Sequence, residues 1–251
     1  TTSSTSRRSS SRGRVTPTAR RDAALADRLD AVRERIAVAA PDPAAVRLVA
    51  VTKGFGVDTV RAALDAGLAD IGESYVQELV AKATEIDAEI DDGVAPVGRP
   101  RPRWHAIGRL QRNKVRKAAP LVTLWHSVDR LSLGSEIARH APGAAVLAQV
   151  NLSGEEQKGG CPPSMAPGLV DGLRDLGLDV RGIMTIAPYG PPEAARPAFN
   201  TARLLRDRLG LTELSMGMTG DLEVALQEGA TLVRIGSGLF GPRPSQGRVR
   251  D

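Results

Sequence analysis

Lys53 follows a segment that is predicted to be buried, where a charged side chain is costly. The run Leu48–Val51 is short, apolar and rich in β-branched residues, which predicts a strand buried on both faces, and Lys53 lies just beyond its carboxyl end. Burial disfavours the charged amine and lowers its pKa from about 10.4. The uncharged amine of Lys53 is then able to form a Schiff base with a carbonyl compound. The alternative is a strand-end lysine whose amine extends into solvent.

The other lysines are all predicted to lie in polar helices or loops, at positions 82, 114, 117 and 158. The many arginines do not offer the same chemistry, because a guanidinium group stays protonated. The sequence therefore singles out Lys53 as the carbonyl-binding residue.

Short apolar segments alternate with amphipathic segments along most of the chain, which predicts an α/β fold. The count of eight strands, each followed by a helical or loop segment, predicts a single (β/α)8 TIM barrel over residues 19–245. The segments 62–72 and 224–236 resemble each other, as repeated units would. A doubly wound open sheet is the alternative, but its first strand would normally lead into a glycine-rich turn. The expected strands are 48–53, 69–73, 103–107, 121–127, 144–151, 180–186, 213–216 and 231–235, and the expected helices are 19–40, 57–66, 75–90, 110–118, 131–140, 164–176, 192–209 and 221–228.

The last two strand-to-helix junctions of this barrel are rich in glycine and hydroxyl residues. They are Ser215–Gly220 and Gly236–Gly238. In TIM barrels the loops after strands seven and eight often hold a phosphate group, and small residues let backbone N–H groups approach it. We expect the cofactor-binding residues in these junctions to be Ser215, Met218, Thr219, Gly236 and Ser237. Asp221 opens the next helix, and its negative charge does not suit an anion ligand.

The motif GSGLFG at residues 236–241 also matches the GxGxxG pattern of dinucleotide sites. Pro242 and Pro244 follow it directly, so we expect no helix to begin there, and the match is weak. Arg234 lies two residues before Gly236 in the last strand. A buried arginine needs an acceptor, which is either a structural carboxylate or the ring nitrogen of a bound heterocycle. A Schiff-base lysine, a phosphate cup and this arginine together describe a pyridoxal phosphate site.

The basic character of the chain comes from its first residues. Residues 1–21 carry six arginines and no acid, whereas the whole chain has a net charge of +5, so residues 22–251 carry −1. We expect residues 1–18 to be a disordered tail rich in serine, threonine and arginine. A nucleic-acid-binding module that uses this tail and a basic helix is one alternative function. The basic residues of that helix are Arg109, Arg112, Lys114, Arg116 and Lys117.

No secretory signal or membrane-spanning run is visible, and Cys161 is the only cysteine, so we expect a cytoplasmic protein without a disulfide. We interpret Cys161 as a thiol without a function. His105 and His126 end neighbouring predicted strands, but two histidines without a third ligand make a poor metal site. We therefore expect no metal.

Eight motifs along the chain resemble those of the pyridoxal phosphate homeostasis proteins, which look like the barrel domain of alanine racemase standing alone. This resemblance implies an internal aldimine on Lys53, a phosphate held by Ser215, Thr219, Gly236 and Ser237, and Arg234 at the pyridine nitrogen. The family usually has Asn where this chain has Ser74, and Ser where it has Thr219. The motifs are AVTK (50–53), IGESYVQE (71–78), WHAIGRLQRNK (104–114), HSVDR (126–130), QVNLSGEEQKGG (149–160), RGIMTI (181–186), LSMGMTGDLEVAL (214–226) and VRIGSGLFGPR (233–243).

An arginine at the pyridine nitrogen disfavours protonation of the ring and weakens it as an electron sink. Tyr75 and Tyr189 are expected at the rim, where tyrosines are more often packing residues than catalysts. We therefore expect an intracellular protein that stores, delivers or buffers pyridoxal phosphate, with no catalytic residues and no robust turnover. The alternative is a racemase-like enzyme that uses the same cofactor. The expected partners are the cofactor itself and, transiently, apo-enzymes that need it, and we expect a monomer, because a closed barrel has no free sheet edge.

Overall fold

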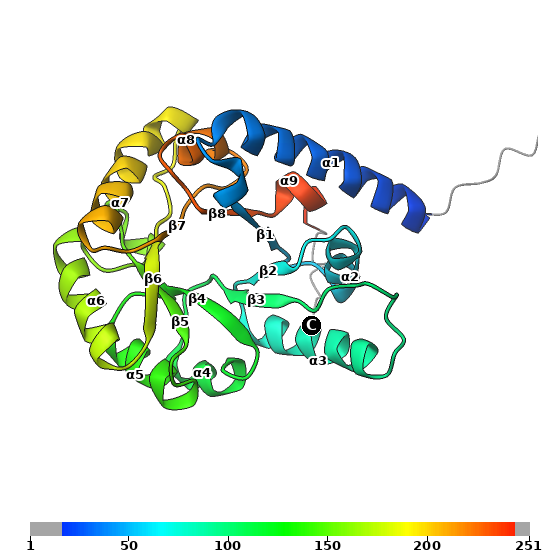
Figure 1. The fold of residues 1–251 in the computed structure, drawn as a ribbon, viewed down its shortest axis with the longest axis horizontal. Coiled ribbons are helices and arrows are strands. Elements are labelled where there is room, and N and C mark those ends of the chain that lie inside the picture. Colours follow the sequence, from blue (N-terminus) through cyan, green and yellow to red (C-terminus); the bar gives the residue numbers. More distant parts are fainter. Residues whose placement is uncertain (1–16, 244–251) are drawn as a thin grey trace, which may run out of the picture.

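The computed structural model describes residues 17–243, and within this range eight parallel strands form a closed barrel (Figure 1). Each strand pairs with the next, and β8 returns to β1, with Val49 opposite Arg234. The predicted (β/α)8 barrel is therefore confirmed. The strands are β1 (Arg47–Val51), β2 (Asp70–Glu73), β3 (Arg103–Ala106), β4 (Val122–Val128), β5 (Ala145–Gln149), β6 (Asp179–Met184), β7 (Glu213–Ser215) and β8 (Leu232–Ile235).

Helices surround the barrel on its outer side, and α1 precedes the first strand and packs against α8 and α9 (Figure 1). Helix α1 begins two residues before the predicted start of the domain at residue 19. The predicted disordered tail, apart from its last two residues, and positions 244–245 lie outside the described residues. The helices are α1 (Pro17–Ala39), α2 (Val57–Asp65), α3 (Val76–Asp91), α4 (Arg112–Ala118), α5 (Leu131–His140), α6 (Ala166–Asp175), α7 (Arg196–Arg208), α8 (Leu222–Gln227) and α9 (Ser237–Phe240).

The side chains of each strand alternate between the helices and the barrel interior. Outward-facing residues such as Ala50 and Ile71 belong to the large apolar core between strands and helices. A second, smaller apolar cluster comprises Val49, Leu124, Ala145, Leu147, Met184 and Leu232. The cluster accounts for only part of the barrel interior, and polar side chains occupy the rest.

The two segments that resemble each other in sequence also have the same local structure. Helix α2 and helix α8 are each followed by a glycine, Gly67 with φ 81° and Gly229 with φ 85°, before the next strand begins. A left-handed glycine ends a helix without steric strain. None of the helices in the described part of the chain combines the length and apolar character needed to cross a bilayer.

Candidate functional site

Lys53 lies two residues beyond β1 and lines a cavity at the carboxyl end of the barrel. Burial lowers the pKa of its amine below the ordinary lysine value, and the positive charges of Arg243 and Arg234 act in the same direction. The carboxylate of Glu73 opposes this shift. The uncharged amine is therefore present at a lower pH than in a free lysine, as the capture of an aldehyde requires.

The turn after Lys53 is fixed by a glycine in a left-handed conformation. Gly54 has φ 75°, and its N–H donates to the Oε2 of Glu78 at 2.8 Å. An added Cβ at this position would lie 3.1 Å from the side chain of Arg243. The turn therefore brings the backbone beside Lys53 close to the chain beyond β8.

The cavity has a volume of about 320 Å³ and brings together six of the seven predicted site residues. They are Lys53, Met218, Thr219, Arg234, Gly236 and Ser237. The cavity is also lined by four apolar residues and one further cation that were not predicted as site residues. They are Val51, Ile107, Met184, Ile186 and Arg243. Because side chains alternate along a strand, Val51 and Ile107 could have been predicted to face the barrel interior. Nothing in the sequence predicted that Arg243 lies near Lys53.

The junctions after β7 and β8 form one rim of this cavity and bond to each other. Gly238 N–H donates to the Oγ1 of Thr219 at 3.2 Å, and a Cβ on Gly238 would lie 3.0 Å from the same oxygen. Glycine is thus required for this close approach. The N–H of Met218 donates to the carboxylate of Asp221 at 2.6 Å, so Asp221 holds the junction from behind.

A one-turn helix, α9, begins directly after Gly236. The expectation that no helix begins there was wrong. Pro242 lies beyond the last residue of this turn, so its missing N–H does not interrupt the hydrogen bonds from Phe240 and Gly241 back to Gly236 and Ser237. The turn holds Ser237, the exposed hydroxyl residue, at the rim of the cavity.

Arg234 is buried inside the barrel and has no carboxylate partner among the described residues. Its Nη1 donates to the Oγ of Ser215 at 2.7 Å, and its Nη2 donates to the carbonyl of Thr185 at 3.0 Å. Burial lowers its pKa to about 10, so the guanidinium remains charged at neutral pH. The sequence left two acceptors open for Arg234, and the prediction of a structural carboxylate is therefore wrong.

A chain of buried hydrogen bonds continues from Ser215 across the barrel interior. Ser215 Oγ lies 2.9 Å from His126 Nδ1, His126 Nε2 lies 2.8 Å from His105 Nδ1, and His105 Nε2 lies 2.9 Å from Asp70 Oδ1. We call Asp70, His105, His126, Ser215 and Arg234 the interior polar chain. Its members come from five strands and are all at most 6% exposed.

The two ends of the interior polar chain have opposite roles. Burial alone would raise the pKa of Asp70, but hydrogen bonds from Arg103 and His105 lower it. The carboxylate of Asp70 is therefore ionised and accepts hydrogen bonds at this end. Arg234 at the other end only donates. Burial lowers the pKa of His126 well below its usual value, which keeps it neutral. Neutral His126 has one donor and one acceptor nitrogen, and these join it to His105 and Ser215.

Ser215 is the predicted site residue that does not line the cavity. It is completely buried, its hydroxyl is bonded to His126, and its oxygen accepts from Arg234. The sequence patterns predict no role for Asp70, and His105 and His126 by themselves make a poor metal site. Polar residues at inward positions of predicted strands were the available signal, but their mutual distances depend on how the barrel closes.

A second buried polar group lies outside the strands, and it corrects one expectation. Lys82 of α3 was predicted in polar surroundings, but it is 6% exposed, and its amine donates to Glu73 Oε1 at 2.6 Å and to the carbonyl of Thr52 at 2.9 Å. Burial raises the pKa of Glu73 despite this partner. Lys82 therefore joins α3 to the ends of β1 and β2.

Within residues 17–243 no three His, Cys, Asp or Glu side chains are grouped as metal ligands. Cys161 is buried beside Val150, and burial raises the pKa of its thiol to about 11. Tyr75 and Tyr189 are exposed at 61% and 92%, and neither lines the cavity of Lys53.

Known proteins share this chain's sequence along most of its length. The model of the alanine racemase N-terminal domain matches residues 23–244. A protein of Pseudomonas aeruginosa named pyridoxal phosphate homeostasis protein is 42% identical over 220 residues, which cover 84% of this chain and 91% of that protein. The chain belongs to the family of pyridoxal phosphate homeostasis proteins. The family resemblance inferred from the eight motifs is thereby confirmed.

Solved structures of this family and its neighbours have the same barrel. The structure of PipY from Synechococcus elongatus with pyridoxal phosphate bound has a TM-score of 0.74 and 33% identity, and covers 86% of this chain and 100% of that chain. A protein of unknown function from Bifidobacterium adolescentis has a TM-score of 0.80 and 35% identity, over 88% of this chain and 96% of that chain. The relatives are named as homeostasis proteins and not as enzymes.

The residues around the cavity fit the cofactor named in this family. The cavity offers one amine whose pKa is lowered, a buried guanidinium with donors only, and a rim of glycines and hydroxyls. These groups complement an aldehyde, an unprotonated ring nitrogen and a phosphate.

Proposed function

We propose that this protein binds pyridoxal 5'-phosphate and serves its homeostasis by storing, delivering or buffering it, with the cofactor held as a Schiff base on Lys53. The observation that carries the proposal is the position of Lys53 and Arg234 in one cavity with the rim of Thr219, Gly236 and Ser237. The bound structure of PipY supports the choice of cofactor. A cytoplasmic location, a monomeric state and transient contact with apo-enzymes stay predictions.

We assign the phosphate to the rim and not to Ser215. Thr219, Gly236 and Ser237 line the cavity. The Ser215 hydroxyl is buried and bonded to His126 and Arg234 inside the barrel. In this proposal Ser215 holds Arg234 in place, and the remaining N–H groups of Arg234 face the ring nitrogen.

Two features support storage rather than robust turnover. Arg234 is anchored as a donor by the interior polar chain, which favours an unprotonated pyridine and a weaker electron sink. Among the described residues that line the cavity there is no Asp, Glu, His, Cys or Tyr, so Lys53 has no second acid or base facing it. Racemisation requires proton transfer on both faces of a bound amino acid.

The test is borohydride reduction of the cofactor-loaded protein, followed by peptide mass mapping. We expect a pyridoxyl adduct on Lys53, and we expect Lys53→Ala to lose the covalent chromophore. An adduct on Lys82, Lys114, Lys117 or Lys158 in place of Lys53 contradicts the assignment. Incubation with single-enantiomer amino acids and chiral analysis tests the racemase-like alternative, which sustained turnover would establish.

A further inference from the structure

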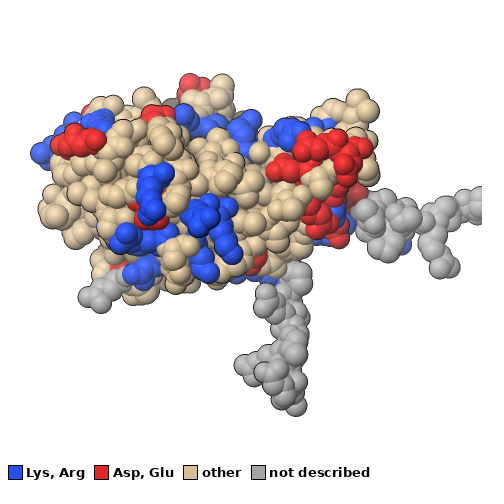
Figure 2. Space-filling model, turned by 90° about the horizontal axis from the view of Figure 1, so that it is seen from below, with Lys and Arg blue, Asp and Glu red and all other residues tan. Residues whose placement is uncertain are grey.

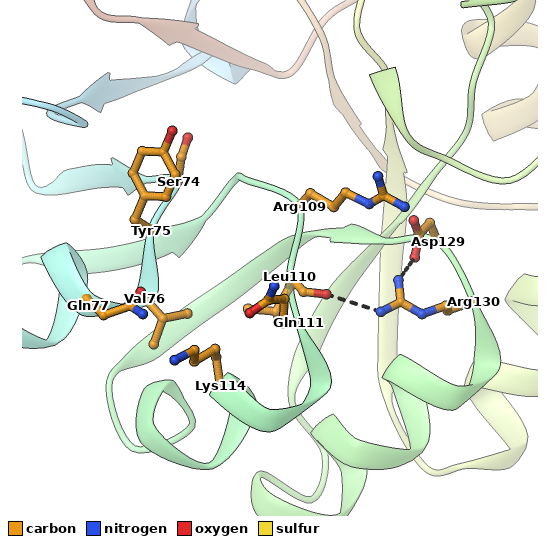
Figure 3. Close-up of a pocket in the computed structure, with 10 residues that line it drawn as sticks. All are labelled: Ser74, Tyr75, Val76, Gln77, Arg109, Leu110, Gln111, Lys114, Asp129 and Arg130. Atoms are coloured by element: carbon orange, nitrogen blue, oxygen red, sulfur yellow. Dashed lines mark hydrogen bonds and ion pairs between the residues drawn. The ribbon is translucent and has the colours of Figure 1, made fainter. Parts of the chain in front are cut away.

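A second and larger cavity lies beside the cofactor cavity on the same end of the barrel (Figure 3). It is formed by the segments that follow β2, β3 and β4, namely residues 74–77, 109–111 and 129–130, together with Lys114 of α4. Its volume is about 680 Å³, and it shares no lining residue with the cavity of Lys53. Ile107 lines one cavity and Arg109, two residues later, lines the other.

The charges around this second cavity are not balanced. Arg109, Lys114 and Arg130 line it, against a single carboxylate, Asp129. Arg130 is held in place, because it bonds to Asp129 and donates to the carbonyl of Leu110 at 3.2 Å. Among the ion pairs of the described residues, none includes Arg109 or Lys114. Two positive charges therefore remain uncompensated within one cavity.

The imbalance extends along the surface that carries the cavity. Figure 2, seen from the side of α3, α4 and α5, shows Lys and Arg side chains gathered near the middle and acidic side chains toward one end. Helix α4 carries only basic charged residues, whereas the second half of α3 is acidic. This stretch includes the basic helix that the sequence offered as a nucleic-acid surface, and of its five basic side chains only Arg109 and Lys114 line the cavity.

One wall of the second cavity is aromatic and apolar. Tyr75 is 61% exposed, and Val76 and Leu110 lie on the same lining. Figure 3 shows Tyr75, Arg109 and Lys114 coming from different elements around the space, with Gln111 near its middle and Gln77 beside Val76 at its edge. A flat ring is able to pack on Tyr75, and the amides offer both donors and acceptors to its edge.

We propose that this second cavity binds a ring-bearing polyphosphate, the chemical class of the nucleoside di- and triphosphates. Arg109 and Lys114 contact the phosphates, as guanidinium and ammonium groups do in other phosphate sites, and Tyr75 packs against the ring. The volume is within the range of small-molecule sites of roughly 300–1,000 Å³ and exceeds that of the cofactor cavity. The two uncompensated positive charges, on Arg109 and Lys114, suit a ligand that carries more than one phosphate group.

Ser74, where the family usually has Asn, is one of the residues of this second cavity. Ser74 lines the second cavity and not the cavity of Lys53. Its shorter side chain leaves more room beside Tyr75.

The experiment is calorimetric titration of the cofactor-loaded full chain with ATP, AMP and inorganic tripolyphosphate. Loading with pyridoxal phosphate is checked first by absorbance, so a failure of the cofactor site is seen separately. We expect ATP to bind more tightly than either AMP or tripolyphosphate. The double substitution of Arg109→Gln with Lys114→Gln is expected to weaken ATP binding at least tenfold, and Tyr75→Ala to weaken ATP but not tripolyphosphate.

The matched control is Arg116→Gln, because Arg116 is on the same helix but outside the cavity. It is expected to change ATP affinity less than twofold. Absence of ATP binding at millimolar concentration would overturn the proposal. An equal loss in Arg116→Gln would instead show a diffuse basic surface, and displacement of ATP by excess pyridoxal phosphate would show a second cofactor site; either result also overturns it.

Discussion

Replacing Ser215 with alanine separates the two roles that this residue has been given. The substitution removes one oxygen without creating a large void. In the structure that oxygen accepts from Arg234 at 2.7 Å and its hydrogen is shared with His126 at 2.9 Å. Ser215→Ala therefore breaks the interior polar chain in its middle, whether or not the cofactor is bound.

The expected loss of stability follows from the two groups left without a partner. One is the Nδ1 of His126 and the other is an N–H of Arg234, and both lie in completely or nearly completely buried side chains. An orphaned buried polar group costs roughly 1–3 kcal/mol, so we expect the free energy of unfolding to fall by about 2–6 kcal/mol. A domain of this kind is stable by about 5–15 kcal/mol, so the variant should still fold.

The assay is urea-induced unfolding of the cofactor-free protein, with Ser237→Ala as the matched control. Ser237 is exposed at the cavity rim, so we expect its variant to unfold within about 0.5 kcal/mol of the original protein but to bind pyridoxal phosphate more weakly. If Ser215→Ala also leaves the cofactor-free protein unchanged and weakens only cofactor binding, Ser215 is a phosphate ligand and the reasoning from the interior polar chain is refuted.

Three further predictions concern single side chains. Because burial lowers the pKa of Lys53, the rate at which the cofactor-free protein captures pyridoxal phosphate should reach half its maximum below pH 10.4, the approximate pKa of free lysine; a midpoint at or above that value contradicts the assignment. Lys82→Met leaves Glu73 buried without its cation and should destabilise the fold by about 3–5 kcal/mol in urea unfolding, whereas Lys117→Met, on the exposed face of α4, should change it little. Cys161, with its pKa raised to about 11, should resist alkylation by iodoacetamide at pH 8 in the folded protein and react after unfolding, as mass spectrometry will show.

The order of the elements could be predicted because it depends on local patterns. Segments of four to eight residues gave the strands, and a glycine after an amphipathic segment gave the ends of helices such as α2 and α8. For the same reason Lys53 was predicted at the end of the first strand and Arg234 in the last, and the structure has Lys53 two residues beyond β1 and Arg234 in β8. The short helix α9 was missed because one turn leaves almost no periodic signal.

The environment of Lys82 was not predictable in this way. Its neighbours Val80, Ala81 and Ala83 are apolar, but its partner Glu73 lies on a different element. Lys117 is likewise followed by an alanine in its helix, and it is exposed. Packing of α3 on the strands decides between the two.

The sequence by itself determined that the chain forms a barrel and that a lysine ends its first strand, because strand periodicity and helix ends are encoded within a few residues. Only the tertiary structure decided which polar side chains meet inside. Asp70 and Arg234 are separated by most of the chain, and they are joined through His105, His126 and Ser215 only because the barrel closes β8 onto β1. Hydrogen bonds need partners within about 3 Å, and no local pattern specifies such a distance between strands so far apart.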